Sequence, residues 1–427
     1  MLETSAFVFA SDLAGEGIET VLDNLERRAG LTGVTPAFAY HAARDVFPRN
    51  PLHRVVLQER GALLFTPDLR LYAGGLVQPA VSASALARDV LGETCRAAAA
   101  RNLAVHAWTV FLHPDRAGDY PSCSPQNAFG DLNSGEFCPA NPDARAYVRA
   151  LAADVCRYEV ESIVAESLHY HGLEHGYHHE RYLISLDPVT RFLLGLCFCA
   201  HCLAAGNRRG VDTPKVHAVV RADLESALAE GRARGPDDAP TRSALAGIAD
   251  GELLGYLDAR ADTISSLVAE AAEVVEAHGR RLVFLDFAGA IKGYATGRPT
   301  GGPAAEISWL HGIDIAEVAR SCHGFEAIAY VADPERLRLD IETYLALIGG
   351  ETSFGVCLRP SPPDCESAEN LASKLSLVRS LGVTRADFYH YGFLRLSALD
   401  WIRTALDAEP RPASPASEGA QPMAGLD

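Results

Sequence analysis

The stretch LLGYLDARADTISSLVAEAAEVVEAHGRRLVFLDF, residues 253–287, joins an amphipathic helix pattern to a short apolar run. Apolar residues recur at helical spacing over 253–279, and apolar residues then fill most of RLVFLDF at 281–287. A nearly continuous apolar strand beside an amphipathic helix is typical of a parallel sheet that is covered by helices. The stretch therefore predicts one α/β unit whose strand is buried on both faces.

The same alternation recurs along the whole chain. The eight strand candidates are 6–10, 35–40, 104–111, 162–167, 281–287, 326–331, 352–359 and 386–391. Helical patterns lie between them, and eight parallel strand-helix units predict an α/β protein with a (β/α)8 TIM barrel fold. We expect residues 1–407 to form this barrel as a single domain.

The interval between the fourth and fifth strands is unusually long. Residues 168–280 separate them, which is far more than one helix requires. The sequence therefore predicts an insertion after strand 4 that contains a segment rich in cysteine and histidine together with further helices. At the other end of the chain, residues 408–427 are rich in Pro, Ala and Ser and predict a disordered tail.

Composition excludes several classes of partner. The formal net charge is −17 over 427 residues, so we expect neither nucleic acid nor an anionic membrane as a partner. The N-terminus has no basic and apolar signal pattern, and no apolar run reaches the roughly 18 residues of a membrane span. These features predict a cytoplasmic protein, in which the ten cysteines are free thiols or metal ligands rather than disulfides.

In a TIM barrel the active site lies at the C-terminal ends of the strands, so polar and aromatic residues there are candidate site residues. These residues are Asp12, His41, Arg44, Trp108, His113, Glu166, His169, His171, Asp286, Tyr330, Asp333, Arg359, Tyr389, His390 and Tyr391. Carboxylates and imidazoles can bind sugar hydroxyls, while aromatic rings pack against sugar C–H groups. The set therefore predicts a small carbohydrate or glycoside as the ligand.

The cysteines give the most specific pattern. GLCFCAHCL places Cys197, Cys199 and Cys202 in a C-x-C-x-x-C spacing, which lets three thiolates converge on one metal ion. Tetrahedral zinc needs a fourth ligand, and GEFCPANPDARAYV supplies Cys138. The sequence thus predicts a structural zinc site with four thiolate ligands.

This combination of motifs, over roughly residues 100–205, resembles the β-galactosidases of glycoside hydrolase family 42. The resemblance implies a glycosidase in which Cys138, Cys197, Cys199 and Cys202 hold a structural zinc beside the barrel. It implies that Glu166, at the end of strand 4, is the catalytic acid/base. It also implies that the chain forms a homo-oligomer.

The second catalytic group departs from the pattern of the clan-A glycoside hydrolases, which the chain also resembles. The retaining enzymes of this clan carry a glutamate at the end of strand 7, whereas this strand ends in GVCLRPSPPD with Arg359 at that position. Cleavage of a glycosidic bond needs one group to protonate the leaving oxygen and another to act at the anomeric carbon. With Glu166 as the general acid, we expect Asp286, which ends the apolar run of strand 5, to be the base or nucleophile. The substrate contacts we expect are Asp12, His41, Arg44, Trp108, His113, His169, His171, Arg359, His390 and Tyr391.

Two other functions remain open. The stretch HYHGLEHGYHHERY at 169–182 contains five histidines, and His169 and His171 with Glu166 and Asp286 would make the ligand set of a metal-dependent sugar isomerase or epimerase. The missing strand-7 acid favours instead a non-catalytic barrel that binds carbohydrate. If the metal belongs to the cysteines, the histidines near strand 4 are free to bind sugar hydroxyls, and those at 175, 178 and 179 shape the rim.

Overall fold

Eight parallel strands close into a barrel in the computed structural model, which describes residues 2–173, 181, 183–231, 240–293 and 295–408. The barrel strands are β1 (Glu3–Val8), β2 (Gly33–Tyr40), β7 (Ala104–Val110), β8 (Ser162–Glu166), β9 (Arg281–Asp286), β10 (Gly324–Ile328), β11 (Ser353–Leu358) and β12 (Arg385–Phe388). Because β1 pairs with both β2 and β12, the sheet has no free edge. The predicted (β/α)8 barrel is confirmed.

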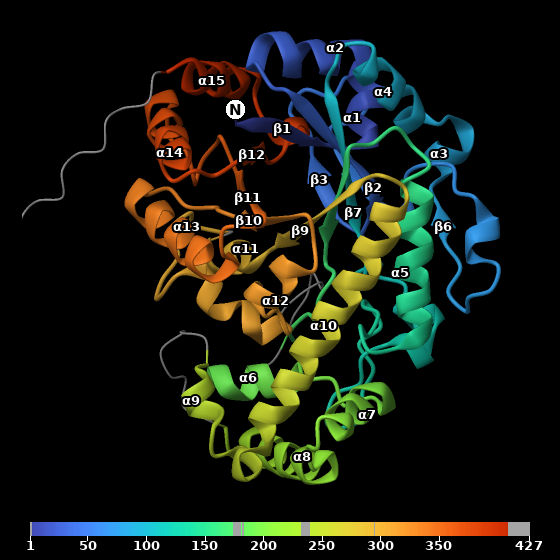
Figure 1. Cartoon of the computed structure of the whole chain (residues 1–427), viewed down its shortest axis with the longest axis vertical. Coiled ribbons are helices and arrows are strands. Elements are labelled where there is room, and N and C mark those ends of the chain that lie inside the picture. The colour runs from blue at the N-terminus through green and yellow to red at the C-terminus, as the bar shows by residue number, and fades with distance from the viewer. Residues whose placement is uncertain (1, 174–180, 182, 232–239, 294, 409–427) are drawn as a thin grey trace, which may run out of the picture.

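Helices cover the outside of the barrel (Figure 1). They are α1 (Ala10–Glu16), α2 (Ile18–Asp23), α4 (Val90–Ala99), α5 (Pro142–Val155), α10 (Glu252–Ala277), α12 (Ile315–Arg320), α13 (Pro334–Ile348), α14 (Ala368–Ser380) and α15 (Leu396–Asp407). Smaller elements are β3 (Arg44–Val46), β4 (Val55–Leu57), β5 (Ala62–Leu63), β6 (Ala80–Val81), α3 (Ala83–Ala87) and α11 (Ala288–Gly293). Asn141 caps α5 through its side chain, and Pro142 follows at the first helical position, where its missing N–H costs nothing.

The interval between β8 and β9 holds α6 (Pro188–Leu194), α7 (Ala200–Arg208), α8 (Thr213–Glu230) and α9 (Arg242–Leu245), followed by α10. Figure 1 shows α6 to α9 gathered at one end of the molecule. The long α10 packs on α5, α12 and β9, so it is the barrel helix of the fourth unit as well as the support of α7 and α8. None of the described helices has the length and apolarity needed to span a membrane. Residues 409–427 of the predicted tail lie outside the described residues.

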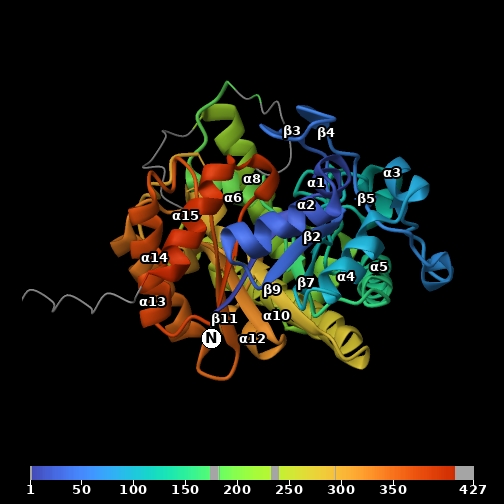
Figure 2. The ribbon, with the colours of Figure 1, turned by 90° about the horizontal axis from the view of Figure 1, so that it is seen from above.

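Two ends of the barrel can be told apart in Figure 2. The N-terminus lies at one end, and the β3–β4 hairpin with α6 and α8 lies at the other. Because the parallel strands all run in the same direction, this second end is where their C-terminal residues meet. The insertion is therefore on the side where a TIM barrel carries its site.

Polar side chains fill the lower half of the barrel, near the strand starts. Arg385 Nε donates a hydrogen bond to Asp387 Oδ2 at 2.9 Å and lies 3.6 Å from Glu326 Oε2, and all three residues are buried. Burial and the neighbouring Asp387 raise the pKa of Glu326 to about 8. Asp387 is the carboxylate that accepts hydrogen bonds from Arg385. A buried ion pair therefore occupies the barrel interior near the strand starts.

Replacing Arg385 with Met is expected to lower the free energy of unfolding by about 3–5 kcal/mol, because it leaves the buried Asp387 carboxylate without its counter-charge. Urea unfolding followed by circular dichroism measures this loss. The matched control is Arg403→Met, which breaks an exposed pair with Asp407 and is expected to change stability by less than about 1 kcal/mol. Equal effects of the two substitutions would contradict this account of the buried ion pair.

Candidate active site

A cavity of about 700 Å³ opens at the C-terminal ends of the barrel strands. Each of the eight strands contributes a residue at or near its end: Phe7, Tyr40, Trp108, Glu166, Leu285, Ile328, Cys357 and Tyr389. The floor is largely apolar and aromatic, as expected for a pocket that binds a sugar ring by its C–H faces. The cavity lies where the fold predicts an active site.

Glu166 lies on the wall of this cavity at the last position of β8. Its Oε2 accepts a hydrogen bond from the indole Nε1 of Trp108, on the neighbouring strand β7. Burial raises the pKa of Glu166, and the Trp108 hydrogen bond and the charge of His113 only partly oppose this shift. A carboxyl group with a raised pKa holds its proton nearer to neutral pH than an exposed glutamate does. In the described part of the chain, Glu166 is the one carboxylate that lines the cavity.

Asp286 is not brought together with Glu166. Leu285 and Phe287 line the cavity, so Asp286 between them points to the other face of β9. There its carboxylate accepts hydrogen bonds from Ser308 Oγ at 2.6 Å and Tyr344 OH at 3.0 Å, and from the backbone N–H of Ala288. The carboxylate ties β9 to the helical layer, so the expected pairing of Glu166 and Asp286 across the barrel mouth is not what the structure shows.

His41 and His113 lie together on one wall. Their rings stack with centroids 4.9 Å apart, and His41 also stacks on Tyr40 at 4.2 Å. His113 Nε2 lies 3.1 Å from Asp115 Oδ1. Burial disfavours the charged imidazole, but the hydrogen bond to Asp115 and the nearby carboxylates outweigh it and raise the pKa of His113. The neighbouring His113 in turn lowers the pKa of Glu166, and of the two histidines His41 lines the cavity.

His169 and His171 follow β8 closely, as expected for the loop that leaves strand 4. His171 lines the cavity, and its Nδ1 lies 3.4 Å from Glu136 Oε2. Burial raises the pKa of Glu136 to about 8 and holds the pKa of His171 well below its usual range. His169 stacks on Phe287 with centroids 4.4 Å apart. The histidines at 175, 178 and 179 lie outside the described residues.

Three of the expected substrate contacts lie in a buried network beside the cavity rather than on its wall. Asp12 Oδ2 accepts a hydrogen bond from the backbone N–H of Phe9 and lies 4.0 Å from His390 Nδ1. Burial raises the pKa of Asp12 to about 7. The hydroxyl of Tyr391 donates to Glu16 Oε2 at 2.8 Å. These contacts hold α1 and the loop after β12 together, and none of the three residues lines the cavity.

The two arginines that were expected to contact the substrate also lie away from the cavity wall. Arg44 is exposed on β3, where it pairs with Leu57 of β4. Arg359 forms a two-pronged ion pair with Asp364 and covers the ring of Tyr330, with its guanidinium carbon 4.2 Å from the ring centroid. Tyr330 itself lines the cavity. Arg359 thus packs against a residue of the cavity wall and does not line the cavity itself.

Several cavity residues carry no strand-end signal in the sequence. Arg260 comes from the middle of α10, His311 follows the fifth strand at a distance, and Lys292 lies in α11. Glu136 and Asp115 do not line the cavity but lie beside His171 and His113, and they come from the long loop between β7 and α5. Tertiary packing brings these residues to the site, so a list of strand ends cannot find them.

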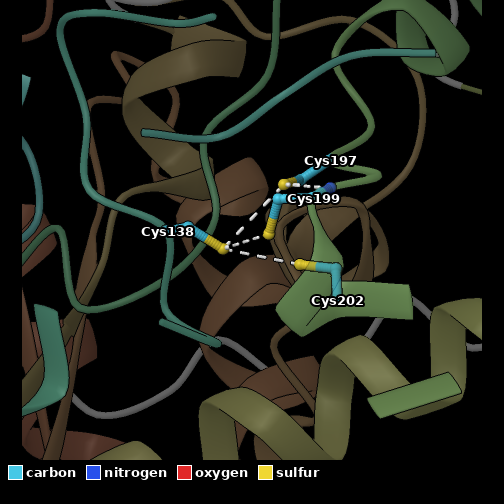
Figure 3. Close-up of side chains that lie close together, drawn as sticks. All are labelled: Cys138, Cys197, Cys199 and Cys202. Atoms are coloured by element: carbon cyan, nitrogen blue, oxygen red, sulfur yellow. Dashed lines mark hydrogen bonds between the residues drawn. The ribbon is translucent and has the colours of Figure 1, made fainter. Parts of the chain in front are cut away.

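The four predicted cysteine ligands converge beside the barrel (Figure 3). Cys138 Sγ lies 3.9, 3.6 and 3.4 Å from the sulfur atoms of Cys197, Cys199 and Cys202. All four are buried, and their sulfur atoms lie within 4.8 Å of one another. Four thiolates at about 2.3 Å from a tetrahedral zinc ion lie about 3.8 Å apart, so this cluster fits such a metal ion.

The surroundings of the cluster suit thiolates. The backbone N–H of Gln126 donates to Cys197 Sγ at 3.3 Å, and the hydroxyl of Tyr170 lies 3.4 Å from Cys202 Sγ. Hydrogen bonds of this kind stabilise the negative sulfur atoms of a metal site. Tyr170 directly precedes His171, so the cysteine cluster contacts the loop that carries this cavity residue.

The other metal site that the sequence suggested is not assembled. Within the described ranges, the four cysteines are the one group of three or more His, Cys, Asp or Glu side chains that lie within reach of a single metal ion. Asp286 faces the helical layer, away from His171 and Glu166 on the cavity wall. The ligand set expected for a metal-dependent isomerase does not form.

The sequence matches no protein-family model, and it matches none of the curated proteins with which it was compared. Solved structures of glycoside hydrolases nevertheless share its fold. The β-galactosidase of the psychrophilic Marinomonas ef1 superposes with a TM-score of 0.55 at 11% identity, over 95% of this chain and 59% of that one. The catalytic domain of β-amylase from Paenibacillus polymyxa gives 0.54 at 9% identity, over 96% of this chain and 99% of that one.

A third structure, the PgaB (BpsB) glycoside hydrolase domain from Bordetella bronchiseptica, gives a TM-score of 0.53 at 11% identity, over 94% of this chain and 95% of that one. At such low identity these likenesses show the fold and leave the resemblance to family 42 a prediction. This chain has the closed eight-stranded barrel that is found in TIM-barrel glycoside hydrolases.

Proposed function

We propose that the protein hydrolyses a small glycoside or oligosaccharide, with Glu166 as the general acid. The observation that carries the proposal is the place of Glu166 at the end of β8, on the wall of the cavity and hydrogen-bonded to Trp108. Burial raises its pKa, which keeps a proton available for a leaving group. The shared fold of three glycoside hydrolases supports the reaction class.

In the proposed reaction Glu166 protonates the glycosidic oxygen while the bond from that oxygen to the anomeric carbon breaks. A water molecule then bonds to the anomeric carbon and gives up a proton to a base. We assign the base to His171, which lines the cavity as a neutral imidazole and contacts Glu136. The imidazolium that results lies beside Glu136, with Nδ1 3.4 Å from Glu136 Oε2, and passes its extra proton to solvent when the product leaves.

The pH dependence gives a test of the acid. A general acid works only while it is protonated, so kcat falls as the pH rises through its pKa. The Trp108 hydrogen bond stabilises the carboxylate and lowers the pKa of Glu166, so Trp108→Phe is expected to move this alkaline limb to higher pH. Profiles of kcat against pH measure the shift, and Trp401→Phe on α15 serves as the control. If the alkaline limb of the kcat profile does not move in Trp108→Phe, the group that titrates there is not Glu166.

We also propose that the four cysteines hold a structural zinc ion. The distances between their sulfur atoms, their burial and the hydrogen bond from Gln126 support this choice. The ion would join the loop before α5 to the start of α7 and hold the insertion against the barrel. No step of the reaction passes through it.

One observation favours a second candidate, a barrel that binds carbohydrate without cleaving it. No second carboxylate among the described residues lines the cavity with Glu166. A screen of nitrophenyl glycosides, together with calorimetric titration of the corresponding free sugars, separates the two functions. Hydrolysis of at least one glycoside is expected from the parent protein, whereas sugar binding with no release of nitrophenol would support the binding barrel.

A further inference from the structure

Arg260 is a buried cation on the wall of the cavity. It lies in the middle of α10 with 3% of its surface exposed, and it lines the same cavity as Glu166. Its Nη1 donates to the carbonyl oxygen of Leu310 at 3.3 Å, and its guanidinium carbon lies 4.4 Å from the centroid of the Tyr170 ring. The Nε atom is buried without a hydrogen-bond partner. The guanidinium therefore keeps donor capacity that the protein does not use.

No carboxylate in the described ranges forms an ion pair with Arg260. Other arginines with little exposure have such partners: Arg49 lies 3.3 Å from Glu16, and Arg385 is paired with Asp387. A buried charge without a counter-charge is costly, and it is rare outside functional sites. An anionic ligand would supply the counter-charge that no described carboxylate gives to Arg260.

The charge of the cavity wall differs from that of the whole protein. The chain has a net charge of −17, yet Arg191, Arg260 and Lys292 all line the cavity. Among the described residues, Glu166 is the one carboxylate on this wall. The buried guanidinium of Arg260 on this wall favours an anionic ligand.

We propose that Arg260, with His311 beside it, binds an acidic group of the sugar, so that the substrate carries a carboxylate or a sulfate. The proposal rests on the proposed function, because it names the substrate class of the same cavity. A planar guanidinium suits such groups, since two of its N–H donors can face two oxygen atoms at once. His311 lines the same wall, with Nδ1 3.2 Å from the carbonyl oxygen of Tyr170.

His311 fits this role as a neutral partner. Burial, His169 and Arg260 together lower the pKa of His311 to about 3, so the imidazole is uncharged at pH 7. Its one N–H, on Nδ1, faces the carbonyl oxygen of Tyr170, so Nε2 can accept a hydrogen bond from a hydroxyl of the same sugar without bringing a second buried charge. Of His311 and Arg260, only Arg260 carries a positive charge.

Binding to a catalytically blocked protein tests the proposal apart from the reaction. In the Glu166→Gln variant, calorimetry compares methyl β-D-glucuronide and methyl β-D-galacturonide with the neutral methyl glucoside and galactoside, and galactose 6-sulfate with galactose. We expect at least one acidic member to bind about 10-fold or more tightly than its neutral partner. Adding Arg260→Met is expected to remove this preference, while Arg260→Lys retains part of it. The matched control is Arg209→Met, an exposed arginine paired with Asp262, which is expected to retain it fully.

Each result of this experiment either supports or overturns the assignment of Arg260. Equal binding of acidic and neutral sugars, or an unchanged preference after Arg260→Met, would overturn the proposal. Metal lost from Arg260→Met with no change in preference would assign the guanidinium to the thiolate cluster through Tyr170, which also overturns it. The carboxylate and sulfate arms show which acidic group is bound. Acidic sugars that bind through Arg260 while no glycoside is cleaved would refute the hydrolase and leave this inference standing.

Discussion

The Glu166→Gln substitution is expected to lower kcat by about 10²- to 10⁴-fold for glycosides with an alkyl or sugar leaving group. The amide cannot donate the proton that the leaving oxygen needs. For a dinitrophenyl glycoside the fall is expected to be much smaller, because that leaving group departs without protonation. Steady-state kinetics with the two kinds of substrate measure the difference. Burial already penalises the charged form of Glu166, so the substitution is not expected to reduce stability at neutral pH.

Glu161→Gln is the matched control for this substitution. Glu161 lies just before β8, at the opposite end of the strand, and pairs at the surface with Arg281. We expect its kcat to equal that of the parent protein for every substrate. A Glu166→Gln variant that retains full activity on alkyl glycosides would show that the general acid is another group.

Replacing Cys202 with Ala is expected to remove one zinc ion per chain and to lower the free energy of unfolding by several kcal/mol. Metal binding contributes about 10–16 kcal/mol to the folding of isolated zinc-finger peptides, so even a fraction of this value is large here. Elemental analysis of the purified protein measures the metal, and urea unfolding measures the stability.

Cys156→Ala provides the comparison for the metal site. Cys156 is a buried free thiol at the end of α5, apart from the four-cysteine cluster. Its replacement is expected to retain the metal and to cost only the packing of one small side chain. Purified parent protein without metal, and with stability that a chelator does not change, would contradict the zinc assignment.

The sequence was sufficient for the barrel and for the cysteine cluster. Eight apolar strands alternating with amphipathic helices allow few other arrangements, and the C-x-C-x-x-C spacing limits how far three sulfur atoms can separate. Glu166 was found because it directly ends an apolar strand that faces the cavity. In these cases the local pattern and the tertiary structure agree.

The orientation of Asp286 could not be predicted in the same way. Both faces of β9 are apolar, since one packs inside the barrel and the other against helices, so LVFLDF does not show which residues point inward. The structure turns Leu285 and Phe287 to the cavity and leaves Asp286 on the other face. Most predicted strands also run past the observed ends, because residues such as Phe9 face the interior beyond the last paired position.

Residues that reach the cavity from helices and loops were missed for a different reason. Arg260 occupies an interior position of a helix whose pattern indicates only which side is apolar, and His311 comes from the loop region between α11 and α12. Their approach to the cavity depends on how α10 and the loop pack on the barrel, which periodicity does not encode. The acidic-sugar site is therefore visible only in three dimensions.

The most direct test of the proposed function is a crystal structure of the Glu166→Gln variant with an uncleaved disaccharide drawn from the glycoside screen. We predict that the sugar fills the cavity, with its glycosidic oxygen about 2.6–3.2 Å from the side chain at position 166. We also predict a water molecule between the anomeric carbon and His171. A disaccharide bound elsewhere, or with its glycosidic oxygen turned away from position 166, would contradict Glu166 as the general acid.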